Sequence, residues 1–180
     1  MKLVEALKEK KRIKRQLDDY VLLVKDHCAI PSTERPRYGS DEAQREQVNR
    51  WIQGHFDLLK RYSNLSLAIT KTNIETVLSI DLDGKVVTKT LAEWILRARE
   101  LATLEYKMWS SITDRGIREE VIPSQIKDGQ PFEKRIVRFY DPKKREEMRM
   151  SLLNEPSIIT AKLEIANAET DLIGFVEDQN

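Results

Sequence analysis

The sequence offers few residues that could bind a metal ion or act as a nucleophile. His27, Cys28 and His55 are its only histidine and cysteine residues, and they do not form the closely spaced ligand pairs of zinc sites. A Cys–His nucleophile pair would need a third group to orient the histidine and donors for an oxyanion, and the sequence shows no local sign of either. We therefore expect no metal, no cofactor and no catalytic residue, and we expect Cys28 to be a small buried side chain.

Acidic residues are abundant, but their spacing does not indicate a reaction centre. Neighbouring carboxylates such as Asp18 and Asp19 point about 100° apart on a helix, so they cannot act together on one bond as acid and base. Asp81, Asp83 and Gly84 resemble part of a calcium loop, yet the EF-hand spacing and its closing glutamate are missing. A tight turn explains this Asp-Gly pair better.

The clearest binding feature is a basic cluster, the six cations between Lys8 and Arg15. Lys8, Lys11, Arg12 and Arg15 could contact nucleic-acid phosphates. However, acidic residues bracket the cluster, no aromatic residue interrupts it, and successive charges on a helix point to different sides. We prefer a solvated helix face or one that meets an acidic protein surface. The acidic stretch from Leu163 to Asn180, which lacks Lys and Arg, is the natural counterpart, so the two ends could pair within or between subunits.

Length and composition exclude several classes of protein. The chain has 180 residues, with 31 Lys and Arg against 30 Asp and Glu, and this balance argues against wholesale binding to nucleic acid or to membrane surfaces. No apolar run approaches a membrane span, and the N-terminus has no signal-peptide core. We therefore expect neither membrane insertion nor secretion through a signal peptide. Only six glycines are present, so glycine-rich loops that could bind phosphate groups should be scarce.

Apolar periodicity predicts two long helices joined by a proline-containing loop. From Leu3 to about Cys28, apolar residues recur every three or four positions, which indicates an amphipathic helix with a narrow stripe shared with a partner. Pro31 ends this helix. Ser40 or Asp41 begins the second helix, which continues to about residue 73. The two helices should pack as an antiparallel hairpin.

Two β-hairpins are expected in the second half of the chain. β-Branched residues on both sides of Asp83-Gly84 predict strands near 76–82 and 85–89 joined by a type I′ turn. Residues 117–140 suggest a second hairpin, weakened by Pro123 and Pro131. Its strands would include Val121-Ile122 and residues 135–140, with a turn at 127–130.

Shorter helices should separate and follow these hairpins. A capping box from Thr90 to Glu93 opens a helix that Arg115 and Gly116 should close. Asp141-Pro142 then begins a short helix to about residue 154. Pro156 interrupts or restarts the chain before a last helix.

These elements predict a mainly α protein of the α+β class, in which a long, coiled-coil-like antiparallel helical hairpin carries two small β-hairpins and further helices. The predicted segments are 1–73, the helical hairpin; 74–116, a β-hairpin plus helix; and 117–180, the second β-hairpin plus C-terminal helices. We expect one continuous fold rather than independent domains. The predicted oligomer or partner interface consists of Leu3, Ile13, Leu17, Trp51, Ile52, Phe56, Leu59 and Trp109.

Several short segments resemble a known family. They are Met1–Leu7, Ala68–Asn73, the Asp83-Gly84 turn with Thr90–Glu93 after it, and Leu163–Leu172. In these segments the chain is similar to the septicolysin-like family of small helical proteins, whose members occur in bacteria and, as more divergent versions, in tailed phages. Residues 117–140 look like an extra hairpin relative to shorter members. The family offers no established catalytic residue to carry over, and we do not transfer the lytic activity in its name, because the sequence has no membrane-active amphipathic segment. The resemblance implies a self-associating helical-hairpin protein and, through the phage relatives, a virion component.

The sequence therefore predicts a non-enzymatic structural or assembly protein that acts through protein–protein contacts. We expect a homo-oligomer that contacts other structural proteins of the same particle, a minor component of the head, neck or tail of a tailed phage, located in the virion or the host cytoplasm. One alternative is a nucleic-acid-binding accessory protein that uses the basic cluster. Another is a small hydrolase with an unrecognised site.

Overall fold

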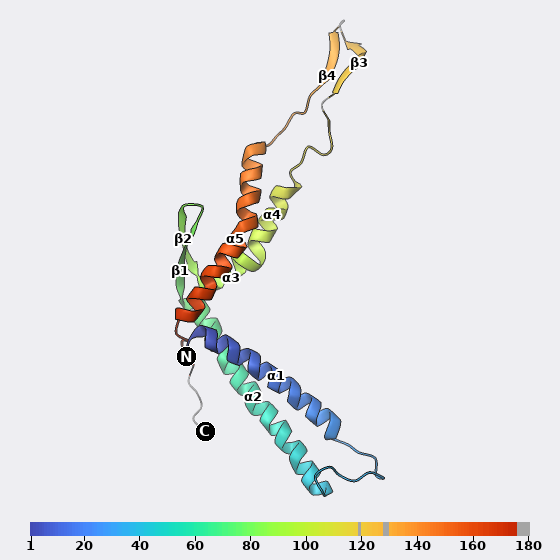
Figure 1. Cartoon of the computed structure of the whole chain (residues 1–180), viewed down its shortest axis with the longest axis vertical. Helices are drawn as coiled ribbons and strands as arrows, with labels where there is room; N and C mark the ends of the chain where they lie inside the picture. Colours follow the sequence, from blue (N-terminus) through green and yellow to red (C-terminus); the bar gives the residue numbers. More distant parts are fainter. Residues whose placement is uncertain (119, 128–129, 176–180) are drawn as a thin grey trace. The chain divides into compact units, whose positions relative to one another are not determined.

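The computed structural model describes residues 1–118, 120–127 and 130–175, which form two compact units (Figure 1). The first unit contains Met1–Leu78, Thr88–Ala92 and the chain from Leu163 onward. The second contains Ser79–Val87 and Glu93–Lys162. Both units are discontinuous in sequence, whereas the segments proposed from the sequence are consecutive.

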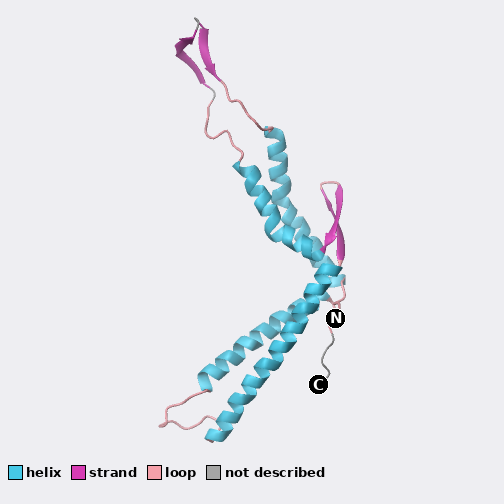
Figure 2. Ribbon diagram, turned by 180° about the vertical axis from the view of Figure 1, so that it is seen from behind, coloured by secondary structure: helices cyan, strands magenta, loops and turns pink. Residues whose placement is uncertain are grey.

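The first unit is built on an antiparallel helical hairpin, as predicted. Helix α1 (Leu3–His27) and helix α2 (Asp41–Glu75) lie side by side along their lengths (Figures 1 and 2). Helix α2 begins at Ser40, whose hydroxyl oxygen accepts a hydrogen bond from the backbone N–H of Ala43 at 3.2 Å. Such a cap satisfies one of the N–H groups that a helix leaves unpaired at its start.

A glycine allows one close contact within this hairpin. A Cβ atom at Gly54 would lie 2.9 Å from the hydroxyl oxygen of Tyr20, so the absence of a side chain lets the tyrosine ring of α1 rest against α2. The core of the first unit consists mainly of aliphatic side chains together with Trp51 and Thr72. Its buried residues are Leu3, Ala6, Ile13, Leu17, Trp51, Leu65, Ala68, Ile69, Thr72, Leu91, Leu163 and Ala166.

The beginning of the chain is tied to residues 169–172. The backbone N–H of Leu3 donates to the Thr170 carbonyl at 2.9 Å, and that of Leu172 donates to the Met1 carbonyl at 2.9 Å. Lys2 adds an ion pair with Asp171, at 2.9 Å between Nζ and Oδ1. Residues 1–3 therefore pair with residues 169–172 within the chain, and the lysine that makes the ion pair precedes the basic cluster. Glu177 and Asp178 of the acidic stretch lie outside the described residues.

The first β-hairpin confirms the Asp-Gly prediction. Strands β1 (Val77–Leu82) and β2 (Lys85–Thr90) form a two-stranded sheet. Asp83 and Gly84 join them at φ values of 53° and 81°, the positive values that a type I′ turn requires at both central positions.

The helix after this hairpin differs from the prediction in two ways. Helix α3 (Leu91–Leu96) passes into a π-helical segment, η1 (Arg97–Leu101), and then into α4 (Ala102–Ser111). The predicted closure at Arg115 and Gly116 is wrong, because Ile112 already has an extended backbone. Arg115 and Gly116 instead form a separate turn with positive φ values, in which the Ile117 N–H donates to the Asp114 carbonyl.

A second β-hairpin is present, but its second strand lies earlier in the chain than expected. Strand β3 (Glu120–Lys127) pairs antiparallel with β4 (Gln130–Lys134). The prediction that residues 135–140 form a strand is wrong: Arg138 and Tyr140 instead bind the carboxylate of Asp114 through their side chains. Asp128 and Gly129 of the expected turn lie outside the described residues.

Helix α5 (Pro142–Glu169) corrects the prediction of a break near Pro156. Asp141 caps its start, because Oδ1 accepts a hydrogen bond from the Lys143 N–H at 2.8 Å. The helix continues through the proline, although proline removes one backbone hydrogen bond. Leu152, Glu155 and Ile159 are buried on either side of it, and this packing offsets the lost bond.

The fold is thus mainly helical α+β, as the sequence predicted. In the part of the chain that the structure describes, we find no helix with the length and apolar character needed to cross a bilayer.

Candidate functional site

The residues predicted as an interface divide into buried and exposed sets. Leu3, Ile13, Leu17 and Trp51 are buried in the first unit, where they hold the helical hairpin together. The Trp51 ring lies 5.5 Å from the ring of His27, measured between centroids, and 5.9 Å from that of Tyr38. These side chains therefore stabilise the hairpin itself.

Ile52, Phe56 and Leu59 lie on the outer side of α2, and Phe56 is 58% exposed. Leu67 and Ile74 of the same helix are also exposed. At about 100° per residue, these five positions fall within about 80° of the helix circumference. The opposite side of α2 carries the buried Leu65, Ala68, Ile69 and Thr72. We call Ile52, Phe56, Leu59, Leu67 and Ile74 the α2 stripe.

Sequence reasoning missed the second half of this stripe. Leu67 and Ile74 follow Ile52 by 15 and 22 residues, which places them on nearly the same side of an α-helix. A helical projection of α2 would have found them, but it would not have shown that this side faces solvent. Trp109, the last predicted interface residue, is half-buried on α4 in the second unit.

A shallow pocket of about 320 Å³ adjoins the stripe. One wall is formed by Leu67 and Lys71 of α2, and the other by the segment Ile173–Phe175. The Ile173 N–H donates to the hydroxyl oxygen of the buried Thr72 at 2.9 Å, which fixes this segment against α2. The first unit therefore presents an exposed aromatic side chain and a pocket on the same helix.

The basic cluster lies on α1. Lys8, Lys11, Arg12 and Arg15 are all exposed, and helical geometry places them within about 100° of one another. Asp18 and Asp19 follow them on the same side. The other two cations of the cluster, Lys10 and Lys14, lie outside this arc, so the six together still spread around the helix.

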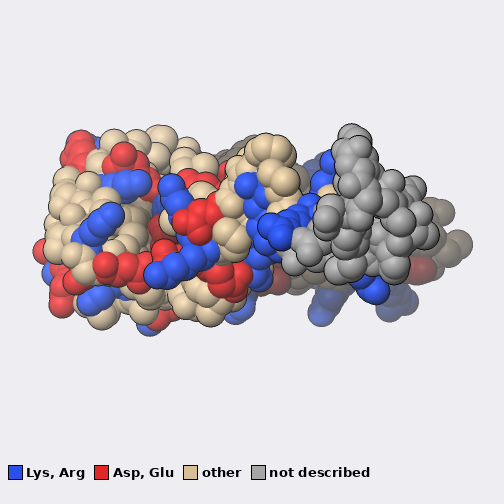
Figure 3. Space-filling view, turned by 90° about the horizontal axis from the view of Figure 1, so that it is seen from above, with Lys and Arg blue, Asp and Glu red and all other residues tan. Residues whose placement is uncertain are grey.

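Nearby groups compensate part of this positive charge. Arg12 donates two hydrogen bonds to the Glu9 carboxylate, each at 2.7 Å, and Arg61 approaches the same carboxylate at 3.2 Å. The hydrogen bond from Arg12 lowers the pKa of Glu9 from its ordinary value. Lys10 lies over the Tyr62 ring, 5.3 Å from its centroid. Figure 3 shows basic and acidic side chains side by side over much of the face that it draws.

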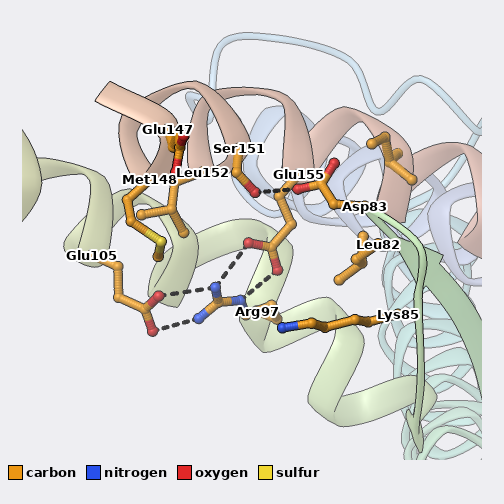
Figure 4. A pocket seen from close by; sticks show the side chains of 11 residues that line it. Leu82, Asp83, Lys85, Arg97, Glu105, Glu147, Met148, Ser151, Leu152 and Glu155 are labelled. Atoms are coloured by element: carbon orange, nitrogen blue, oxygen red, sulfur yellow. Dashed lines mark hydrogen bonds and ion pairs between the residues drawn. The ribbon is translucent and has the colours of Figure 1, made fainter. Parts of the chain in front are cut away.

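A second pocket, of about 420 Å³, lies in the second unit (Figure 4). At its base the guanidinium of Arg97 binds Glu155 of α5, at 2.6 Å from Nε to Oε1, and Glu105 of α4, at 2.9 Å from Nη2 to Oε2. The hydrogen bonds that Arg97 donates to Glu155, followed by those that it donates to Glu105, raise the pKa of Arg97. Arg97 and Glu155 are 58 residues apart, and no local pattern in the sequence links them.

Most polar side chains that line this pocket form hydrogen bonds or ion pairs with each other. Ser151 Oγ donates to Asp83 Oδ2 at 2.5 Å, which joins the β1–β2 turn to α5. Both carboxylates around Arg97 are occupied by its guanidinium (Figure 4). These contacts hold the β1–β2 turn, α4 and α5 of the second unit together.

The histidine and cysteine residues do not converge. Arg37 Nη1 lies 3.0 Å from His27 Nε2, and His55 packs edge-on against Phe56. Cys28 is exposed, so the prediction of a buried cysteine is wrong: α1 ends at His27, and Cys28 caps it beyond the core. Across residues 1–118, 120–127 and 130–175, no group of three or more His, Cys, Asp or Glu side chains is arranged to hold a metal ion.

Comparison with known proteins establishes a fold relationship. No family model and no curated protein matches the sequence. The chain is similar to the crystal structure of a functionally unknown conserved protein from Corynebacterium diphtheriae. The two share 18% sequence identity with a TM-score of 0.56, over 96% of this chain and 98% of that one. At this identity the likeness shows the fold alone, and the resemblance to the septicolysin-like family stays a prediction.

Proposed function

We propose that this protein is a non-enzymatic structural or assembly protein that self-associates through its amphipathic helices. The observation that carries the proposal is the α2 stripe, in which Phe56 and Leu67 are 58% and 67% exposed. Rows of large apolar side chains on a helix are the kind of surface that helical partners cover. The pockets provide no comparable argument for catalysis, because the polar groups around Arg97 bind each other.

The place of assembly is a finer proposal that rests on the family resemblance alone. We propose a minor component of a tailed-phage particle, in its head, neck or tail, in contact with other structural proteins of that particle. Mass spectrometry of purified particles tests this: the protein should be retained through density-gradient purification, and its loss with the soluble fraction would contradict the placement.

Analytical ultracentrifugation of the purified protein over a hundredfold range of concentration tests self-association. We expect a reversible shift from the 21.0 kDa monomer to a larger species as the concentration rises. A protein that stays monomeric throughout this range, and that binds no other component of the particle, would contradict the proposed function.

The exposed cations on one side of α1 favour a second candidate, a nucleic-acid-binding accessory protein. Lys8, Lys11 and Arg15 are exposed together on that side, and phosphate contacts by such residues release counterions. Binding to duplex DNA should therefore weaken steeply between about 50 and 200 mM salt. Charge reversal at Lys11 and Arg15 should abolish it. Binding that is absent at low salt, or that does not change with salt, removes this candidate.

A further inference from the structure

We propose that the partner of the α2 stripe is the same stripe of a second copy, packed antiparallel about a two-fold axis at Ser63. This inference rests on the proposed function and specifies its interface. It uses only the first unit, in which α1 covers one side of α2 and leaves the stripe exposed.

The stripe is nearly symmetric about Ser63. Ile52 and Ile74 lie eleven residues before and after it, and Leu59 and Leu67 lie four residues before and after it. In a symmetric dimer each residue meets its counterpart and the contact is repeated once. Antiparallel pairing about Ser63 therefore places Ile52 against Ile74 of the second copy, and Leu59 against Leu67 of the second copy. The small serine at the centre allows the helices to approach closely.

Phe56 breaks the symmetry, and the adjacent pocket accommodates it. In this register Phe56 lies opposite Thr70 of the second copy, beside the pocket walled by Leu67, Lys71 and Phe175. Aromatic side chains that fill pockets dominate the energy of many interfaces. The Lys71 ammonium at the pocket rim is a suitable partner for the face of an aromatic ring. The two-fold axis repeats this insertion, so both pockets are filled.

The polar residues beside the stripe are compatible with this register. Lys60 and Lys71 lie on the flank that carries the pocket, together with Gln53 and Asn64. Antiparallel pairing brings Lys60 near Asn64 of the second copy and Lys71 near Gln53 of the second copy. No two lysines lie directly opposite each other along this flank, because Lys60 is displaced along the helix axis by about 7.5 Å from Lys71 of the second copy and by about 9 Å from Lys60 of the second copy. Direct contact between like charges would disfavour the dimer.

The size of the contact sets the expected affinity. The stripe covers 22 residue steps, about 33 Å of helix. The area that one narrow helix face of this length can bury is smaller than the roughly 800 Å² per partner of a standard interface. We therefore expect a reversible dimer with a dissociation constant on the order of micromolar.

Phe56→Asp tests the predicted anchor. We expect this substitution to weaken dimerisation by about 30-fold or more, as for an interface hot spot. Leu104→Asp in the second unit is the matched control, because Leu104 is exposed to the same 58% as Phe56, and it should leave the dimer unchanged. Sedimentation velocity over a concentration series measures both, with circular dichroism to confirm that each variant is folded.

Disulfide formation tests the register in a Cys28→Ser background. Ser63→Cys should form a disulfide-linked dimer on mild oxidation, whereas the control Arg50→Cys, on another side of α2, should not. A mixture of Ile52→Cys and Ile74→Cys proteins should form the mixed dimer. Ile52→Cys alone should not cross-link, because its two copies would lie about 33 Å apart, far beyond the reach of a disulfide.

The outcomes separate failure of this interface from failure of the proposed function. Dimerisation that survives Phe56→Asp, or that cross-links efficiently through Arg50→Cys or through Ile52→Cys alone, overturns the interface and leaves self-association intact. A protein that is monomeric at every concentration overturns the interface as well. If such a protein also binds no other component of the particle, the proposed function is overturned too.

Discussion

Arg97 shows how a single residue can depend on contacts that are distant in sequence. Its side chain is 16% exposed and binds Glu155, whose side chain is 9% exposed. A buried charge that loses its partner is strongly destabilising, whereas replacing both partners by apolar groups of similar size is often neutral. We therefore interpret the pair as a structural contact that holds the second unit together.

This interpretation predicts the behaviour of a double mutant. Arg97→Met alone should lower the free energy of unfolding by about 3 kcal/mol, because it leaves Glu155 buried without its cation. Arg97→Met combined with Glu155→Leu should recover most of that loss. Urea denaturation of the two variants and the unmodified protein measures this, and a double mutant no more stable than Arg97→Met would contradict it.

The contact made by the Asp114 carboxylate should contribute to stability in a way that depends strongly on pH. Arg138 donates to it at 2.9 and 2.7 Å and Tyr140 at 2.7 Å, and the hydrogen bond from Arg138 is the main reason that the pKa of Asp114 falls from 3.8 to about 2. Because the folded pKa lies below the unfolded one, this contact stabilises fully above pH about 4 and is lost as the pH falls towards about 2. Carboxyl NMR should show the low pKa directly.

Tyr140 provides an independent measure of the same contact. The hydrogen bond to Asp114 raises the pKa of Tyr140 above its usual value of 10.0. Asp114→Asn should lower that pKa, as followed by ultraviolet absorbance at alkaline pH, whereas the control Asp57→Asn should not. An unchanged Tyr140 pKa in Asp114→Asn would show that the two side chains do not interact in solution.

At the scale of elements, α5 shows that packing can outweigh a local break signal. The helix runs from Pro142 to Glu169 with Pro156 inside it. Proline removes one hydrogen bond and crowds the preceding turn, yet the buried Leu152 and Ile159 on either side hold the helix in place. The sequence alone favoured a break, because local propensity was the only information at that position.

Replacing this proline should therefore stabilise the protein. Pro156→Ala restores a backbone donor within an existing helix, so the free energy of unfolding should rise by about 1–3 kcal/mol. The neighbouring Ser157→Ala is a suitable control, with a change within about 0.5 kcal/mol. A loss of stability in Pro156→Ala, measured by urea denaturation, would mean that packing of the proline ring matters more than the missing hydrogen bond.

At the scale of the whole chain, the most consequential contacts join segments far apart in sequence. Thr72 is fully buried on α2, and its hydroxyl donates to the Ala68 carbonyl and accepts from the Ile173 N–H. Together with the bonds from Leu3 to Thr170 and from Leu172 to Met1, this joins α2, the start of the chain and residues 170–173 within the first unit.

Loss of this hydroxyl should loosen the closure. Thr72→Val leaves the Ile173 N–H without its acceptor at nearly constant volume, which should cost about 1–3 kcal/mol. Thr72→Ser should retain most of the stability. Hydrogen exchange of the Leu3 and Ile173 amides should accelerate in Thr72→Val, and protection that stays at the level of the unmodified protein would contradict the proposed coupling.

The sequence predicted most elements because their boundaries depend on neighbouring residues. The Ser40 cap, the Asp83-Gly84 turn and the Asp141-Pro142 helix start are each determined by chemistry within a few positions, and each lies where it was expected. Three of the eight predicted interface residues, Ile52, Phe56 and Leu59, likewise belong to the exposed stripe.

Only the tertiary structure decided which apolar positions are covered and which charges are paired. Leu65 and Leu67 have the same side chain two residues apart, yet one is fully buried and the other 67% exposed, because α1 packs against one side of α2. The pairing of Arg97 with Glu155 and the exposure of Cys28 depend equally on where other segments lie. Local chemistry in the sequence thus determined helices and turns, whereas burial, which arises from contacts between distant segments, determined the surface through which we propose the protein assembles.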